Sequence, residues 1–273
     1  MRIETVRTGG FSMNFCRFGR GGEPLVILPG MGVQRVLDSA DAIASAYRAL
    51  AEDFTLYVFE RRNDMPADYP VRDMARDTAA AFEALGLGAV NLFGASQGGM
   101  MALVIAAEHP ALVKRLALGS TSARVTDARY RAVFEPWAAL ARSGDAAALY
   151  LAFGEALYPG RMYEKLKPLL RDAAKAVTDE DMRRFATEAR AMRGFDILDE
   201  LGGIACPTLV LGAADDRVLG GAASGEIAER VKGAALHMYD GYGHAAYDLA
   251  PDYKARLLQF LAGRGQADGE DGT

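Results

Sequence analysis

The stretch Val90-Asn91-Leu92-Phe93-Gly94-Ala95-Ser96-Gln97-Gly98-Gly99-Met100 decides the fold. It places Gly-x-Ser-x-Gly between an apolar run, which predicts a buried strand, and a segment with helical spacing. A serine on a sharp strand-to-helix turn needs glycines where neighbouring side chains would collide, and Gly94 and Gly98 meet that need. We therefore interpret Ser96 as a nucleophile at the start of a helix, in preference to a serine that only caps the helix.

The segments on either side of this turn alternate between predicted strands and helices. Gly9-Gly10 predicts a hairpin between the first two strands, whereas the later alternation predicts parallel pairing, and hence an α/β fold with a mostly parallel sheet flanked by helices. The predicted strands are Arg2–Arg7, Met13–Phe18, Leu25–Leu28, Phe54–Phe59, Val90–Phe93, Leu116–Leu118, Pro207–Leu211 and Ala235–Tyr239. The predicted helices are Asp38–Ala51, Val71–Leu85, Gly98–Glu108, Ala222–Val231 and Asp252–Leu261.

The alternation is interrupted by a segment that has helical periodicity and no convincing strand. We expect residues 123–197 to form a helical cap on a core domain of residues 1–122 and 198–262. Aromatic side chains in this segment, such as Trp137 and Phe153, are expected to pack within the cap more often than to line a pocket. The last residues, 263–273, are poor in apolar side chains, so a mobile tail is expected there.

Composition excludes several classes of protein. The chain has 273 residues, of which 51% are hydrophobic and 25% charged, with a net charge of −5 and interspersed signs. This is typical of a globular protein with a large core and gives no support to nucleic-acid binding. Cys16 and Cys206 have no partners at metal-binding spacing, the N-terminus has no targeting pattern, and no stretch is apolar enough to span a membrane. We expect a soluble, cytoplasmic protein without metal, cofactor, nucleic-acid or membrane partner; a homodimer is left open.

A nucleophilic serine needs a base, and the chain has three histidines. His109 follows the helix after Ser96, where a histidine usually caps the helix end. His237 lies inside a predicted strand, where it is expected to pack or to face solvent. His244 lies in a loop at the carboxyl end of a strand, where open α/β sheets build their ligand sites, so position and elimination favour His244.

The base needs an acid to orient it, which should follow another strand. Asp215 and Asp216 both lie in the loop after Pro207–Leu211. Two adjacent side chains cannot both point at one imidazole, and we prefer Asp215, with Asp216 as the alternative. Asp127 is a further alternative for this acid, but it lies well after the strand that ends at Leu118.

The negative oxygen of a tetrahedral intermediate needs two preorganised donors. One is expected to be the backbone N–H of Gln97, directly after the nucleophile. The loop Leu28-Pro29-Gly30-Met31-Gly32 leaves an earlier strand, and we expect the N–H of Met31 to be the second donor. The alternative is a simple glycine turn that leaves the strand.

Two arginines, Arg61 and Arg62, follow the predicted strand Phe54–Phe59. We expect a solvated pair or a salt bridge with Asp64 or Asp68. Binding of an anionic substrate is the alternative.

With these residues in place, the chain resembles the α/β-hydrolase superfamily, in its capped serine esterase and proline-iminopeptidase-like branch. The resemblance covers nearly the whole length and is carried by the ordered motifs LVILPGMG, FERRNDMP, GASQGGMMALVIAAEHPALVKRLAL, IACPTLVLGAADDRV and GYGHAAYD. It implies an eight-stranded sheet with a helical cap between the sixth and seventh strands.

The resemblance also bears on single residues. In relatives with the Gly-x-x-Asp-Asp-Arg-Val pattern the first aspartate is the usual triad member, which favours Asp215. Many relatives carry His-Gly before the oxyanion donor, whereas this chain has Pro29-Gly30 and lacks that supporting side chain. A serine at the elbow argues against the dehalogenase and epoxide hydrolase branches, which need a carboxylate there.

The leading hypothesis is a serine hydrolase that cleaves a small or medium acyl ester through an acyl-enzyme, with the triad Ser96, Asp215 and His244. The alternatives are an aminopeptidase-like amide hydrolase and an acyltransferase with the same triad. A non-catalytic ligand receptor is a third interpretation, but a receptor need not retain all three side chains. Fold alone does not name the substrate.

Overall fold

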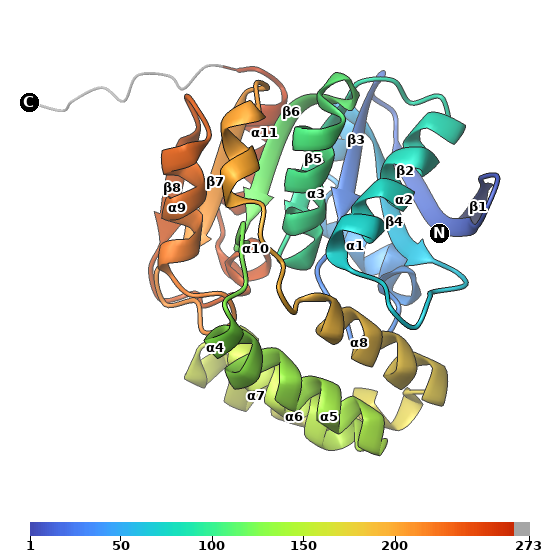
Figure 1. Ribbon diagram of the computed structural model, residues 1–273, viewed down its shortest axis with the longest axis vertical. Helices are drawn as coiled ribbons and strands as arrows, with labels where there is room; N and C mark the ends of the chain where they lie inside the picture. The colour runs from blue at the N-terminus through green and yellow to red at the C-terminus, as the bar shows by residue number, and fades with distance from the viewer. Residues whose placement is uncertain (265–273) are drawn as a thin grey trace, which may run out of the picture.

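The computed structural model describes residues 1–264, which are built around one eight-stranded sheet (Figure 1). The strand order is β1-β2-β4-β3-β5-β6-β7-β8, with antiparallel β1–β2 and β2–β4 pairs and parallel pairs elsewhere. The predicted fold class is therefore confirmed. The strands are β1 Ile3–Arg7, β2 Ser12–Gly19, β3 Glu23–Leu28, β4 Phe54–Arg62, β5 Val90–Ala95, β6 Val113–Gly119, β7 Thr208–Ala213 and β8 Ala235–Tyr239.

Helices cover both faces of the sheet, which explains why β5 and β7 are buried along their whole length. One apolar core lies under α2, α3 and α9, and a second lies under α1, α10 and α11. These helices are α1 Ala40–Ala46, α2 Val71–Ala84, α3 Gln97–Glu108, α9 Ala222–Arg230, α10 Ala246–Leu249 and α11 Tyr253–Leu261.

The chain between β6 and β7 forms a group of helices at one end of the sheet (Figure 1). The two ends of this segment lie together, because Arg124 and Asp196 form an antiparallel bridge and the Ile197 N–H donates to Ala123 O at 2.9 Å. The helices are α4 Asp127–Arg129, α5 Glu135–Ser143, α6 Ala146–Leu157, α7 Gly160–Ala173 and α8 Asp179–Ala191, with a π-helical turn at Tyr130–Phe134.

The aromatic side chains of this segment pack against one another. Trp137 meets Phe134 and Phe153 edge to face, with ring centroids 5.5 and 5.0 Å apart, and Phe153 meets Phe185 in the same way. Phe134, Trp137 and Phe185 are buried. These rings therefore form the core of the helical segment, as the helical spacing indicates.

Some boundaries differ from the sequence-based expectation. The predicted helix Asp38–Ala51 is divided into a 3₁₀ turn at Val36–Ser39, the short helix α1 and a second 3₁₀ turn at Leu50–Glu52. Tyr47 and Leu50, which follow α1, both pack into the second core. Strand β4 is longer than expected because β2 pairs with it as far as Arg62, so Arg61 and Arg62 lie within the strand. The expected mobile tail lies, from residue 265 on, outside the described residues.

Two further findings concern the described residues. None of their helices is long and apolar enough to cross a lipid bilayer. Cys16 and Cys206 are both free thiols.

A glycine substitution tests the close packing of α3 against β3. A Cβ on Gly98 would lie 2.0 Å from the carbonyl oxygen of Leu28, which is backbone and cannot turn aside. We expect Gly98→Ala to lower the free energy of unfolding by about 2–4 kcal/mol, measured by urea denaturation.

The matched control is Gly225→Ala in α9, where a Cβ meets nothing within 4 Å. Alanine favours the helix at that position, so we expect the free energy of unfolding to rise by about 0.5–1 kcal/mol. Equal losses in both variants would contradict the packing argument.

Candidate active site

Ser96 lies at a strained turn between β5 and α3. Its backbone has φ 53° and ψ −124°, a region that non-glycine residues rarely adopt. The Ser96 N–H donates to Gly119 O at 2.8 Å, and its carbonyl oxygen accepts from Gly99 N–H at 2.9 Å. The strand before and the helix after the turn therefore hold a conformation that projects the side chain out of the chain path.

Glycines make this turn sterically feasible. A Cβ on Gly94 would lie 2.4 Å from Gly98 O, where the helix passes over the end of β5. A Cβ on Gly30 would lie 2.9 Å from Cβ of Ser96, so the loop after β3 runs directly beside the serine. Gly94 and Gly98 thus lie where helix α3 meets the end of β5, and the Pro29–Gly32 loop lies beside Ser96.

His244 reaches Ser96 from the loop after β8. Its Nε2 lies 2.9 Å from Oγ of Ser96, and the ring is only 2% exposed. The other two histidines lie elsewhere: His109 terminates α3, and His237 packs edge to face on Tyr239 within β8, where burial lowers its pKa.

The acid beside His244 is Asp216, so the expectation of Asp215 is wrong. Oδ2 of Asp216 lies 2.8 Å from His244 Nδ1, whereas Oδ1 of Asp215 accepts from the Gly243 N–H at 3.1 Å. The reason is the turn after β7, in which the Asp216 N–H donates back to Ala213 O at 3.3 Å. Asp216 is thereby turned inward and buried, while Asp215 is left at the exposed corner.

A local signal could have favoured Asp216. Its Oδ1 accepts from the N–H groups of Val218 and Leu219 at 2.7 and 3.0 Å, which is the Asx-turn geometry that aspartate often adopts. Val218 and Leu219 are buried, so they direct this end of the turn into the protein. Asp215 has a separate task, because it holds the backbone one residue before His244.

The environment of Asp216 defines the proton positions. Burial alone would raise the pKa of Asp216, but the nearby His244 and the hydrogen bonds to its two oxygens hold it below its usual range. An ionised carboxylate can only accept, so Nδ1 of His244 carries the proton toward Asp216. Nε2 is then free to accept the hydroxyl proton of Ser96.

Two backbone donors expected from the sequence have no protein acceptor. Within the described residues, neither the Met31 N–H nor the Gln97 N–H makes a hydrogen bond. Gln97 is the first residue of α3, so its N–H belongs to the positive end of that helix. The Pro29–Gly32 loop brings Met31 to the same neighbourhood.

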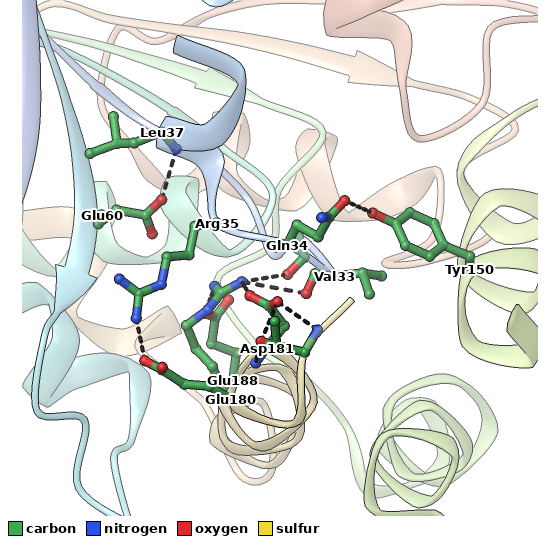
Figure 2. Close-up of polar contacts among 12 residues, drawn as sticks. Val33, Gln34, Arg35, Leu37, Glu60, Tyr150, Glu180, Asp181 and Glu188 are labelled. Carbon is green, nitrogen blue, oxygen red and sulfur yellow. Dashed lines mark hydrogen bonds and ion pairs between the residues drawn. The ribbon is translucent and has the colours of Figure 1, made fainter. Parts of the chain in front are cut away.

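The helical segment is bonded directly to this site. The side-chain amide of Gln97 donates to Glu188 O in α8 at 2.9 Å, and the Ala245 N–H donates to Leu157 O in α6 at 3.1 Å. The Tyr150 hydroxyl in α6 donates to Oε1 of Gln34 at 2.8 Å (Figure 2). Ser96 retains 8% exposure beneath these contacts.

Two arginines support the loop after β3. Nη2 of Arg61 donates to Pro29 O and to Oε1 of Gln97, both at 3.0 Å, and Nη2 of Arg184 in α8 donates to Gly32 O at 3.3 Å. Arg61 forms no salt bridge with the expected Asp64 or Asp68, and Arg62 pairs instead with Asp77. Nothing in the sequence around Arg184 indicates its contact, because α8 is distant along the chain.

A buried carboxyl near these arginines provides a pH-dependent test. Burial raises the pKa of Glu60 above its ordinary value of 4.5, although Arg184 opposes this, and Oε1 of Glu60 accepts from the Leu37 N–H. A raised pKa means that the contribution of Glu60 to stability is present at low pH and is lost as pH rises through the folded-state pKa. Glu60→Gln keeps the acceptor without the charge. We expect its unfolding free energy, relative to that of the native chain, to be greater at about pH 8 than at about pH 4.5.

The measurement is urea denaturation of both proteins at the two pH values. A relative stability that falls as pH rises would contradict the prediction. It would show that the folded protein prefers an ionised Glu60, bound by Arg184.

Comparisons with known proteins identify the family of this chain. The family model described as "alpha/beta hydrolase fold" matches residues 23–251. The chain is 33% identical over 215 residues to "Putative carbamate hydrolase RutD" of Variovorax paradoxus, covering 72% of this chain and 75% of that protein. It is 25% identical over 266 residues to "Serine hydrolase BPHL" of Mus musculus, covering 94% and 85%.

Solved structures share the whole architecture. The alpha/beta hydrolase MGS-M2, from a deep-sea metagenome library, superposes with a TM-score of 0.85 at 20% identity over 98% of this chain and 100% of its own. The enol-lactonase of Burkholderia xenovorans LB400 gives 0.81 at 21% identity over 95% and 100%. The family match spans most of the chain, and this protein therefore belongs to the alpha/beta hydrolase fold family and is a hydrolase.

Proposed function

We propose that the protein is a serine hydrolase that cleaves a small or medium acyl ester through an acyl-enzyme. The observation that carries the proposal is the unbroken chain of contacts from Ser96 Oγ to His244 Nε2, at 2.9 Å, and from His244 Nδ1 to Asp216 Oδ2, at 2.8 Å. Nucleophile, base and orienting acid in this order activate a serine hydroxyl that is otherwise a weak nucleophile.

The proposed reaction has two halves. Ser96 Oγ attacks the substrate carbonyl carbon as His244 Nε2 takes its proton, and collapse of the intermediate expels the alcohol, which receives that proton. Water then attacks the acyl-enzyme with His244 as base and releases the acid. Asp216 stays ionised throughout and stabilises the imidazolium.

The oxygen that becomes negative in both halves needs donors. The proposed pair is the N–H of Gln97, directly after Ser96, and the N–H of Met31, directly after Gly30, which packs beside Ser96. The N-terminus of α3 assists them. Because Arg61 and Arg184 hold carbonyl groups of the loop that carries Met31, they are the proposed positioning residues for this donor.

Residues 123–197 are proposed to act as a cap on a core of residues 1–122 and 198–262. Three of the contacts described above join this segment to the site, through Gln97, Gln34 and Ala245. A cap held this closely favours small and medium substrates over bulky ones. The relevant substrate is a small molecule, and we propose a cytoplasmic location.

A second candidate substrate class is a carbamate. Its support is the 33% identity to a protein named "Putative carbamate hydrolase RutD". A carbamate carbonyl can be attacked by the same serine, so the triad geometry does not separate the two classes. A comparison of kcat/KM for an acetate and a carbamate of the same alcohol separates them.

Two neighbouring carboxylates allow a matched test of the triad. We expect Asp216→Asn to lower kcat for p-nitrophenyl acetate by about 10³–10⁴-fold, because an amide at this position favours the wrong tautomer of His244. Asp215→Asn, one residue away, keeps an oxygen to accept the Gly243 N–H, so its kcat should change by less than about fivefold.

The variants are assayed together with Ser96→Ala, which removes the nucleophile. Circular dichroism confirms folding of each protein. Similar losses in the two asparagine variants, or activity in Ser96→Ala equal to that of the native chain, would refute the proposed mechanism.

A further inference from the structure

A cavity of about 650 Å³ lies beside the carboxyl end of β4, between that strand and helices α5 and α8. Of its 18 lining residues, seven are arginines and three are carboxylic acids. The chain as a whole carries a net charge of −5, so this concentration of positive charge runs against its overall balance. Such a local excess of guanidinium groups is typical of sites that bind carboxylate or phosphate.

Arg61 lines the cavity and is a buried cation that forms no ion pair with any described residue. Arg61 is only 5% exposed. No carboxylate oxygen of the described residues lies within 4.0 Å of its guanidinium nitrogens. Nη2 donates to two neutral oxygens, while Nε and Nη1 have no acceptor among these residues. Burying an unpaired charge is costly, so the arrangement is suited to an anion that the protein itself does not supply.

Arg184, on α8, lines the cavity from the opposite side. Its Nη1 pairs with Glu188 at 2.8 Å and its Nη2 donates to Gly32 O, but its Nε has no acceptor among the described residues. Its charge is therefore largely compensated. Its Nε is buried, so Arg184 shapes the wall of the cavity, whereas Arg61 contributes a guanidinium group that has no ion-pair partner among the described residues.

The rim adds further donors. Arg142 in α5 and Arg183 in α8 are exposed, and their guanidinium groups make no hydrogen bond or ion pair within the described part of the chain. Arg35 is directed toward Glu180, as Figure 2 shows. The two rim guanidinium groups are thus available to a ligand.

The acids that face the cavity do not neutralise it. Glu180 is paired with Arg35, and Asp179 is exposed at the start of α8. Glu60 is buried, and its Oε1 accepts from the Leu37 N–H instead of forming an ion pair with Arg61. Among the described residues, no acid that lines the cavity is paired with Arg61.

We propose that this cavity is a binding site for a small molecule that carries carboxylate or phosphate groups, separate from the candidate active site at Ser96. The separation follows from the lining, which contains neither Ser96, His244 nor Gln97. Nη2 of Arg61 donates to Pro29 O and to Oε1 of Gln97, and the same residue is part of the cavity lining. Arg61 therefore links the proposed anion site to the Pro29–Gly32 loop, which carries the proposed oxyanion donor Met31.

Isothermal titration with succinate and with inorganic phosphate tests the proposal and distinguishes the two ligand chemistries. We expect the full-length protein to bind at least one of them saturably, and Arg142→Ala/Arg183→Ala to weaken that binding by about tenfold, since two charge-assisted contacts are removed. The control is Arg161→Ala/Arg171→Ala on α7, which removes the same charge from exposed residues away from the cavity and should change affinity by less than about twofold.

Three results would overturn the proposal. One is no saturable binding of either anion to the native chain. The second is an equal loss of affinity in the control variant, which would indicate general electrostatic attraction. The third is competitive inhibition of p-nitrophenyl acetate hydrolysis by the bound anion, which would place it at Ser96 instead.

Discussion

The close approach of β5, α3 and the loop after β3 is the constraint on which the rest of the site depends. Ser96 has φ 53° because the chain must pass from strand to helix within one residue. A Cβ on Gly98 would overlap Leu28 O, and a Cβ on Gly30 would crowd Ser96, so the close approach requires glycine at both positions. The energy of the strained turn is offset by the apolar packing of α3, which is buried along most of its length.

Asp216 and His244 approach Ser96 from the loops after β7 and β8, which lie on the other side of β5 from β3. Strands β7 and β8 are parallel neighbours, so the loops after them leave the same edge. Asp216 contacts the imidazole of His244. Asp215 accepts from the N–H of Gly243, the residue before His244. The parallel pairing of β7 and β8 brings their loops together, and the turn after β7 directs Asp216 toward His244. His244 then lies within hydrogen-bond distance of Ser96.

The sequence indicates much of this because the relevant signals are local. Alternating apolar runs and helical periods predict an α/β fold, and Gly-x-Ser-x-Gly between a strand and a helix predicts where Ser96 lies. His244 follows from its place after a strand. The choice between Asp215 and Asp216 failed because it depends on how the turn after β7 folds back onto Ala213, which a pattern of residue types does not specify.

Contacts between residues far apart in the chain could not be predicted from the sequence. The arginine cavity unites Arg61 in β4 with Arg184 in α8, residues that only the placement of the helical segment brings together. The same placement brings the side-chain amide of Gln97 to Glu188 O, so the turn at Ser96 is bonded to helix α8. Arg61 therefore connects three parts of the molecule: the sheet, the Pro29–Gly32 loop and the arginine-lined cavity.

Rapid-quench mass spectrometry with p-nitrophenyl acetate tests directly whether Ser96 becomes acylated. We expect the native chain to gain the mass of one acetyl group during the first turnover, peptide mapping to place this group on Ser96, and Ser96→Ala to gain none. Steady hydrolysis without any acylated species under acid quench, or acylation at another residue, would contradict a mechanism that proceeds through an acyl group on Ser96.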